Sequence, residues 1–270
     1  MDIAKSRIGI IGGGNMGQAI LKGLSSGRPP AGLLAWDALA ACRERLVREF
    51  PMVTVPENNR ALVAASDIVI LAVKPQVIGP VMAEIGPDLN EKQLLISIAA
   101  GVPCRRLEEH LDRPVPTIRI MPNTPALINR GISAIAAGSN AEKSHLENAQ
   151  ALFSCLGETV IVPESAMDMV TAVSGSGPAY VFLVIEALTD AAVGLGLARD
   201  LARKLVVETI LGSTELLKSS GRHPMELKDM VTSPGGTTIA GLAELEKYGL
   251  RHAFNAALQS ACQRSRELGG

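Results

Sequence analysis

The sequence has few aromatic residues and almost no net charge. Aromatic residues make up 3% of the chain and hydrophobic residues 47%, so the core must be built from aliphatic and alanine side chains, which suits closely packed helices. The 26 basic and 27 acidic residues give a formal net charge of -1. This balance offers no sustained field for nucleic acid or an anionic membrane surface, and we expect neither among the partners.

Cysteines and histidines form no metal-binding pattern. The four cysteines are far apart, with no C-x-x-C pair and no histidine cluster near them; they are Cys42, Cys104, Cys155 and Cys262. Metal sites and disulfide frameworks need close or regularly spaced ligands. The sequence therefore predicts neither a metal site nor a disulfide framework.

No targeting or membrane segment is expected either. The first predicted strand begins at Ile8, which leaves no room for a signal peptide. The longest uncharged run, residues 170–185, contains Pro178 and is shorter than a membrane span requires. We interpret this run as a buried helix with its leading loop, and we expect a cytoplasmic protein.

A glycine-rich turn follows the first predicted strand. Residues 8–17 read IGIIGGGNMG, in which Gly12, Gly14 and Gly17 match the spacing G-x-G-x-x-G. Dinucleotide-binding folds use this spacing for a tight turn, for close approach of the backbone to a pyrophosphate, and for packing of the helix on the strand. A helical pattern, a second strand at residues 33–36 and then Asp37 follow, about twenty residues on, where a carboxylate would meet a ribose hydroxyl. This order favours a dinucleotide site over a glycine-rich turn without a ligand.

Two continuous apolar runs predict further strands of a parallel sheet. Residues 67–73 read DIVILAV and residues 94–98 read LLISI, and unbroken apolar runs are typical of strands buried on both faces. Ligands of open α/β sheets lie beyond the carboxyl ends of the strands. The loops that begin at Lys74 and Ala99 should therefore border the cofactor, although a solvated loop cation is an equally good interpretation of Lys74 alone.

The remainder of the first half completes the sheet. Further strands are predicted at residues 53–55, 115–120, 131–137 and 158–162, and helices at residues 42–50, 61–65 and 141–155. Pro122 and Pro125 fix φ twice, which predicts a stiff loop without regular structure at residues 119–125.

The last hundred or so residues have a helical pattern throughout. Residues 178–194 are apolar on nearly every face, with Glu186 and Asp190 as their only charges. A helix that is apolar all round must be buried all round. We expect a second copy of the chain to cover it, with a self-contained bundle as the alternative.

A proline and two glycines precede a late helix. Residues 233–238 read SPGGTT, which would leave the amides of Gly236, Thr237 and Thr238 without helical partners and facing forward. Free amides at a helix start form a small anion cradle. From the residues alone, a plain connection between helices is an equally good interpretation.

Six motifs make the chain resemble pyrroline-5-carboxylate reductases over its whole length. They are GIIGGGNMG at 9–17, AVKPQ at 72–76, SIAAGV at 97–102, RIMPNTPALINRG at 119–131, VSGSGPAYVF at 173–182 and LKDMVTSPGGTTIAGL at 227–242. The resemblance implies reduction of 1-pyrroline-5-carboxylate to L-proline, the last step of proline biosynthesis, by hydride from NADP(H), with NAD(H) as an alternative. It also implies an α/β fold, with a Rossmann-type doubly wound sheet in a cofactor-binding domain at residues 1–163. An all-helical domain for substrate binding and dimerisation follows at residues 164–270. Five such dimers could assemble into a decamer.

The resemblance assigns site residues by motif position. Thr238 is implied as the catalytic residue, whose hydroxyl bonds the imine nitrogen. The implied substrate contacts are Ser233, Gly236, Thr237, Thr238 and Glu164. The implied cofactor contacts are Gly12, Gly13, Gly14, Asn15, Met16, Gly17, Asp37, Asn59, Val73, Lys74, Pro75, Ala100 and Met121.

Two absences separate this reaction from its rivals. No histidine stands in a motif, and an enzyme acting on an alcohol would need a base for the hydroxyl proton, whereas an imine reductase does not. Residues 170–198 contain no lysine, which counts against a β-hydroxyacid dehydrogenase of the 6-phosphogluconate type. A non-catalytic nicotinamide-binding regulator is the rival of another class.

Asp37 favours NADH while Arg43 would compensate for a 2′-phosphate, so we predict that both cofactors work.

Overall fold

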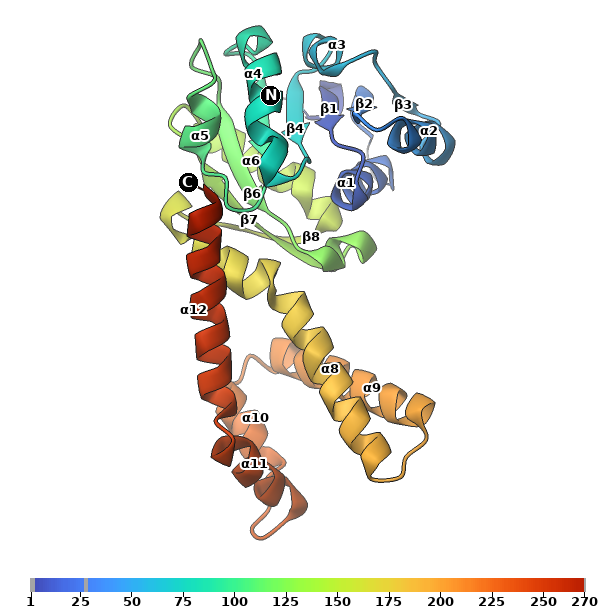
Figure 1. The fold of residues 1–270 in the computed structure, drawn as a ribbon, viewed down its shortest axis with the longest axis vertical. Coiled ribbons are helices and arrows are strands. Elements are labelled where there is room, and N and C mark those ends of the chain that lie inside the picture. The colour runs from blue at the N-terminus through green and yellow to red at the C-terminus, as the bar shows by residue number, and fades with distance from the viewer. Residues whose placement is uncertain (1–2, 27–28, 270) are drawn as a thin grey trace. The chain divides into compact units, whose positions relative to one another are not determined.

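The computed structural model describes residues 3–26 and 29–269. The chain divides into two compact units, one formed by Met1–Ser176 with Ser260–Gly270 and the other by Gly177–Gln259. The first unit holds a β-sheet and its covering helices, and the second is helical (Figure 1).

Strands and helices alternate along the first unit. Its strands are β1 Arg7–Ile11, β2 Gly32–Trp36, β3 Val53–Thr54, β4 Ile68–Leu71, β5 Leu94–Ser97, β6 Thr117–Met121, β7 Gly131–Ala137 and β8 Gly157–Ile161. Its α-helices are α1 Asn15–Ser26, α2 Ala40–Glu49, α3 Asn59–Ala64, α4 Ile78–Ile85, α5 Cys104–Glu108, α6 Lys143–Phe153 and α7 Met167–Val170.

The described strands form one 8-stranded sheet in the order β3-β2-β1-β4-β5-β6-β7-β8. Neighbouring strands among the described residues are parallel, apart from the antiparallel pair β6 and β7. The chain leaves β1 toward β2 and β3 and returns on the other side at β4. This change of direction is the switch point at which open α/β sheets bind ligands. The predicted Rossmann-type doubly wound sheet is confirmed, and β7 and β8 extend it.

The core lies on both faces of the sheet. All residues of β4 and β5 are buried, as their unbroken apolar runs predict. Ile20 of α1 and Phe153 of α6 pack in one apolar cluster, while Leu62 of α3 and Met82 of α4 pack in the other. Burying one such side chain stabilises the fold by roughly 1.5–3 kcal/mol.

Several element boundaries differ from the prediction, and three of the differences have a local cause. Helix α3 begins at Asn59 rather than residue 61, because the Asn58 side chain accepts a 2.8 Å hydrogen bond from the Ala61 amide and caps the helix. The expected irregular loop at 119–125 is wrong: its first residues belong to β6, and Thr124–Ile128 is a 3-10 helix. Pro125 stands in the first turn of that helix, where its missing N–H costs nothing. The expected loop before the apolar helix is a π-helix, Thr171–Gly175.

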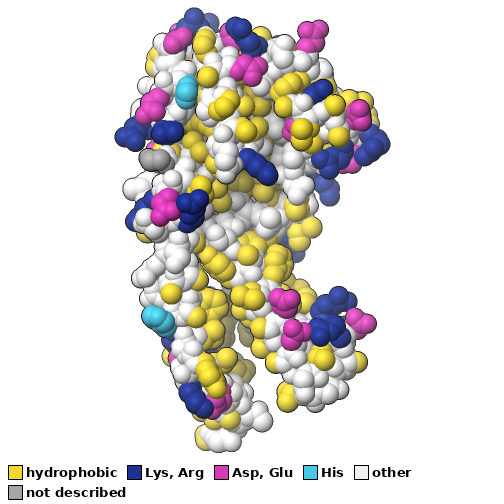
Figure 2. Space-filling model, viewed as in Figure 1, with side chains coloured by type: hydrophobic (Ala, Val, Ile, Leu, Met, Phe, Trp, Pro, Cys, Tyr) yellow, Lys and Arg dark blue, Asp and Glu magenta, His cyan; other side chains and the backbone are white. Residues whose placement is uncertain are grey.

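The second unit contains α8 Gly177–Gly194, α9 Arg199–Ser220, α10 Pro224–Met230 and α11 Thr237–Lys247, and α12 Leu250–Gly269 ends in the first unit. Within the described chain, Thr189 is the one buried residue of α8. Phe182 and Leu183 are 64% and 63% exposed, and Figure 2 shows apolar side chains along these helices. The chain alone therefore does not bury the apolar helix as a self-contained bundle would.

Candidate active site

The three motif glycines differ in what surrounds them. Gly12 has φ 112°, and a Cβ there would lie 2.5 Å from the Ala72 carbonyl oxygen. A Cβ on Gly17 would overlap the Gly12 carbonyl, so this glycine lets α1 pack against β1. At Gly14 a Cβ would meet nothing within 4 Å, and Gly14 and Asn15 are exposed whereas Gly12, Gly13 and Gly17 are buried. The open space at the helix start fits the approach of a pyrophosphate.

Asp37 lies at the end of β2, next to this turn. Its Oδ2 accepts a 2.7 Å hydrogen bond from the Gly13 amide, and its Oδ1 accepts a 2.8 Å bond from the Leu39 amide. Arg43 Nη1 donates to the carbonyl oxygens of Asp37 and Ala38 over 2.7 and 2.9 Å, and the guanidinium lies 5.7 Å from the centre of the Trp36 ring. The carboxylate and a cation are thus both fixed at the ribose end of the predicted cofactor site.

The other predicted cofactor residues follow three neighbouring strands. Val73 lies against Gly12 after β4, and the exposed Lys74 precedes a 3-10 helix that begins at Pro75. Ala100 stands in the loop after β5, and Met121 ends β6. Met16, in α1, packs against the core. The structure thus brings these strand ends to one edge of the sheet.

Asn59 has a buried acceptor without a partner. This first residue of α3 is 3% exposed, and its Nδ2 donates to Glu84 Oε2 over 2.7 Å. Its Oδ1 has no hydrogen-bond partner among the described residues. Buried polar atoms usually have a partner, so the orphan oxygen fits a ligand donor at the predicted adenosine end of the cofactor site.

The predicted substrate residues gather at the start of α11, in the second unit. Gly236 is the N-cap residue, and the described chain offers no acceptor to the amides of Thr237 and Thr238. The expectation for Gly236 was wrong in one respect, because its amide donates to the Ser233 carbonyl over 3.1 Å. Of the three amides that the sequence predicts to be free, those of Thr237 and Thr238 therefore remain so within the described chain. The Ser233 hydroxyl lies against Gly236, and Thr238 is partly exposed.

Glu164 has a different environment from these residues, within the first unit. Its Oε1 accepts a 2.5 Å hydrogen bond from the Cys104 amide and lies 3.8 Å from Nη1 of Arg119. Arg119 Nη2 is 3.6 Å from Asp168 Oδ1, which accepts a 2.7 Å bond from the Ser265 hydroxyl. The sequence prediction missed Arg119, although a lone arginine within the apolar strand TIRIM is a signal for a partnered buried charge.

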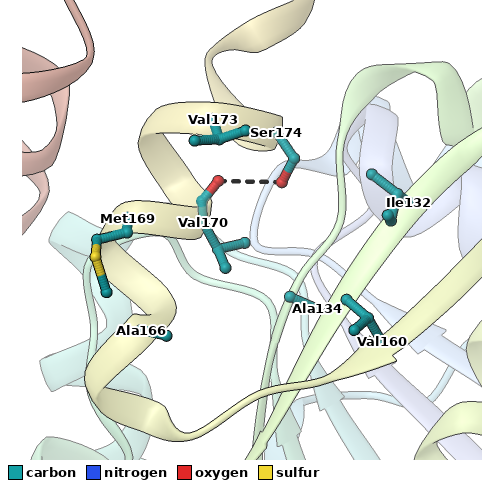
Figure 3. Close-up of a pocket in the computed structure, with 8 residues that line it drawn as sticks. All are labelled: Ile132, Ala134, Val160, Ala166, Met169, Val170, Val173 and Ser174. Atoms are coloured by element: carbon teal, nitrogen blue, oxygen red, sulfur yellow. Dashed lines mark hydrogen bonds between the residues drawn. The ribbon is translucent and has the colours of Figure 1, made fainter. Parts of the chain in front are cut away.

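An apolar pocket of about 310 Å³ also lies in the first unit (Figure 3). Ile132 and Ala134 of β7 and Val160 of β8 face Val170 and Val173 across it. The one hydroxyl in its lining, from Ser174, donates to the Val170 carbonyl over 3.1 Å. The pocket offers no polar group for a dinucleotide or a carboxylate, so it is separate from the candidate site.

The doubly wound sheet, its glycine turn and the helical unit define a Rossmann-type oxidoreductase that uses a dinucleotide. Residues 7–101 match the family described as NADP oxidoreductase, coenzyme F420-dependent, and residues 164–268 match pyrroline-5-carboxylate reductase dimerisation. The pyrroline-5-carboxylate reductase of Synechocystis sp. is 46% identical over 266 residues, covering 97% of this chain and 98% of the relative. That of Methanosarcina acetivorans is 42% identical over 268 residues, with 97% and 98% coverage. The chain belongs to the pyrroline-5-carboxylate reductase family.

Solved structures agree with this assignment. Plasmodium falciparum pyrroline carboxylate reductase, with NADP bound, has a TM-score of 0.90 and 33% identity, with 100% of both chains covered. The Streptococcus pyogenes enzyme has a TM-score of 0.90 and 33% identity, with 98% and 99% covered. A reductive aminase from Aspergillus terreus, with TM-score 0.64 and 18% identity, covering 98% of this chain and 88% of its own, shares the fold.

The stretch Glu164–Gly194 is, by length and composition, apolar enough to cross a membrane, and 6% of its apolar window is buried inside the chain. The uncharged run at residues 170–185 lies within this longer stretch. One such stretch is a weak indication of a membrane span, and the match to a dimerisation domain covers all of it.

Proposed function

We propose that the chain reduces 1-pyrroline-5-carboxylate to L-proline with NADPH, and also with NADH, as the last step of proline biosynthesis. The observation that carries the proposal is similarity to pyrroline-5-carboxylate reductases along nearly their full length, with 46% identity to that of Synechocystis sp.. The NADP in the Plasmodium falciparum structure supports the cofactor.

The first unit would hold the cofactor. The proposed contacts are Gly12 to Gly17 for the pyrophosphate, Asp37 and Asn59 for the adenosine end, and Val73, Lys74, Pro75, Ala100 and Met121 at the strand ends. The open space at Gly14 and the orphan oxygen of Asn59 support this fit. When bound, the reduced nicotinamide supplies the hydride.

The start of α11 would hold the imine. The amides of Thr237 and Thr238, with Ser233 and Gly236 beside them, would bind the substrate carboxylate, because a helix start carries partial positive charge. The Thr238 hydroxyl would bond the ring nitrogen and orient the protonated imine, so that the imine carbon accepts hydride while the nitrogen keeps its proton. Positioning supplies most of the rate in such a reaction.

The proposal extends to assembly and location. Residues 1–163 would form the cofactor domain and residues 164–270 the domain for substrate binding and dimerisation. The apolar exposed face of α8 supports cover by a second copy. Five dimers would form a decamer, and the enzyme would act in the cytoplasm.

A direct assay tests the reaction. Purified protein is mixed with pyrroline-5-carboxylate and NADPH or NADH, and the loss of reduced-cofactor absorbance and the formation of proline are followed. A parallel sample without the imine measures background oxidation. We expect imine-dependent oxidation with both cofactors, and no proline with either would contradict the proposal.

A further inference from the structure

Arg119 joins three segments of the first unit. Its side chain is 5% exposed and lies within 4 Å of Glu164 and Asp168, whose side chains are 30% and 26% exposed. Glu164 begins the 3-10 helix before α7, and Asp168 lies in α7. Ser265 of α12 donates to Asp168. We call these four residues the Arg119 cluster.

Two members of the Arg119 cluster, Glu164 and Ser265, border the loop between β5 and α5, residues 98–103. At the end of this loop, the Cys104 amide donates to Glu164 Oε1 over 2.5 Å. In its middle, Gly101 has φ 78°, and a Cβ there would lie 3.0 Å from both the Leu268 Cβ and the Ser265 carbonyl oxygen. The loop therefore contacts Glu164 at one point and the end of α12 at another. Arg119 and Asp168 connect Glu164 to Ser265 of α12.

From this arrangement we infer that Glu164 is a positioning residue, which fixes the loop carrying Ala100 through the Cys104 amide and is itself fixed by Arg119. The inference rests on the proposed function, in which Ala100 borders the nicotinamide cofactor. In this role, the Glu164 side chain must be long enough for its oxygen to accept the hydrogen bond from the Cys104 amide. Direct contact with the substrate, which the family resemblance implies for Glu164, would instead depend on the carboxylate charge.

Two conservative variants separate the length of the Glu164 side chain from its charge. Glu164→Gln keeps an oxygen that can accept from the Cys104 amide but has no charge. Glu164→Asp keeps the charge beside Arg119 but is shorter by one methylene and does not reach the amide. Glu109→Ala is the control, since Glu109, the C-cap residue of α5, forms an exposed ion pair with Arg105 at 3.8 Å and lies at the opposite end of α5 from the Cys104 amide.

Hydrogen exchange of the amides of residues 99–104 and the Kd for NADPH, measured by nucleotide fluorescence, are compared across the variants. We expect Glu164→Asp to speed exchange and raise the Kd by about tenfold, the order of the loss when a buried amide is left without its acceptor, with Glu164→Gln and the control close to the wild type. The inference is overturned if Glu164→Asp behaves like the wild type. It is also overturned if Glu164→Gln instead raises the KM for the imine without changing exchange, because Glu164 would then act as a substrate contact.

The exchange measurement needs no turnover. A protein that shows the expected exchange and Kd pattern but does not reduce the imine would refute the proposed reaction and leave the positioning role standing. If the wild type reduces the imine but Glu164→Asp leaves the amide exchange of residues 99–104 unchanged, the proposed reaction would stand and the positioning role would be refuted.

Discussion

The amide of Gly13 donates to Asp37 Oδ2 over 2.7 Å, joining the glycine turn after β1 to the end of β2. The other Asp37 oxygen accepts from Leu39. Each carboxylate oxygen has two lone-pair sites, so both can still accept from a ribose hydroxyl. In the proposed site, the Asp37 charge would therefore stay at the position where NADH and NADPH differ.

Removing that charge should shift cofactor preference toward NADPH. In Asp37→Asn a 2′-phosphate no longer faces a negative side chain, and we expect the ratio of kcat/KM for NADPH over NADH to rise about 3- to 10-fold. Arg43→Ala should lower the same ratio, because the cation beside Asp37 is lost. Steady-state kinetics with both cofactors measure the ratio, and movement of both variants in one direction would refute these roles.

Alanine at two glycines of the turn should have different effects. At Gly14 the added Cβ meets nothing within 4 Å in the protein, so the Tm should hold while NADPH affinity falls by about tenfold or more, since the methyl occupies the pyrophosphate approach. At Gly17 the Cβ overlaps the Gly12 carbonyl, and we expect a loss of about 1–3 kcal/mol in the free energy of unfolding. Thermal melts and NADPH titrations of both variants decide, and an unchanged NADPH affinity in Gly14→Ala would count against the site.

The stability of the protein should fall above pH 9. Burial raises the pKa of the Cys155 thiol from 9.0 to about 11. Burial, and then the nearby Glu164 carboxylate, also raise the pKa of the Cys104 thiol. The unfolded chain loses these protons first, so the folded state binds more protons and the free energy of unfolding decreases as pH rises from about 9. Urea unfolding between pH 8 and 10.5 measures the slope, which Cys155→Ala should reduce; an equal slope would contradict the assignment.

A charge on the exposed face of α8 should break the dimer. Phe182 is 64% exposed in the single chain, and Phe182→Glu would place an unpaired carboxylate in the interface, which is costly. Light scattering after size exclusion should give a monomer mass for this variant. Asp200→Ala, at a side chain that is 94% exposed, should keep the wild-type mass. A dimer of unchanged stability in Phe182→Glu would place the interface elsewhere.

The sequence predicts the sheet well because its signals are local. Unbroken apolar runs identify β4 and β5, and glycines followed by Asp37 locate the turn. The 3-10 helix at Thr124–Ile128 was missed because a proline ends an α-helix but fits the first turn of a new one. The π-helix Thr171–Gly175 was missed because its sequence has the small residues of a loop.

Contacts between segments that are far apart in the chain could not be predicted from the sequence. Nothing local in TIRIM indicates that Arg119 meets Glu164, Asp168 and, through Asp168, Ser265 of the last helix. The hydrogen bond that occupies the Gly236 amide was also missed, because it depends on how residues 233–236 turn rather than on their composition. The helix start at Thr237 was predictable from the proline and glycines before it.

The comparison of Thr238→Ala with Thr238→Ser tests the central claim most directly, that a hydroxyl at the start of α11 orients the imine for hydride from a cofactor held by the first unit. We predict that Thr238→Ala lowers kcat for pyrroline-5-carboxylate reduction about 100-fold, with an unchanged Kd for NADPH, and that Thr238→Ser retains most of the rate. Wild-type imine reduction in Thr238→Ala would contradict the account.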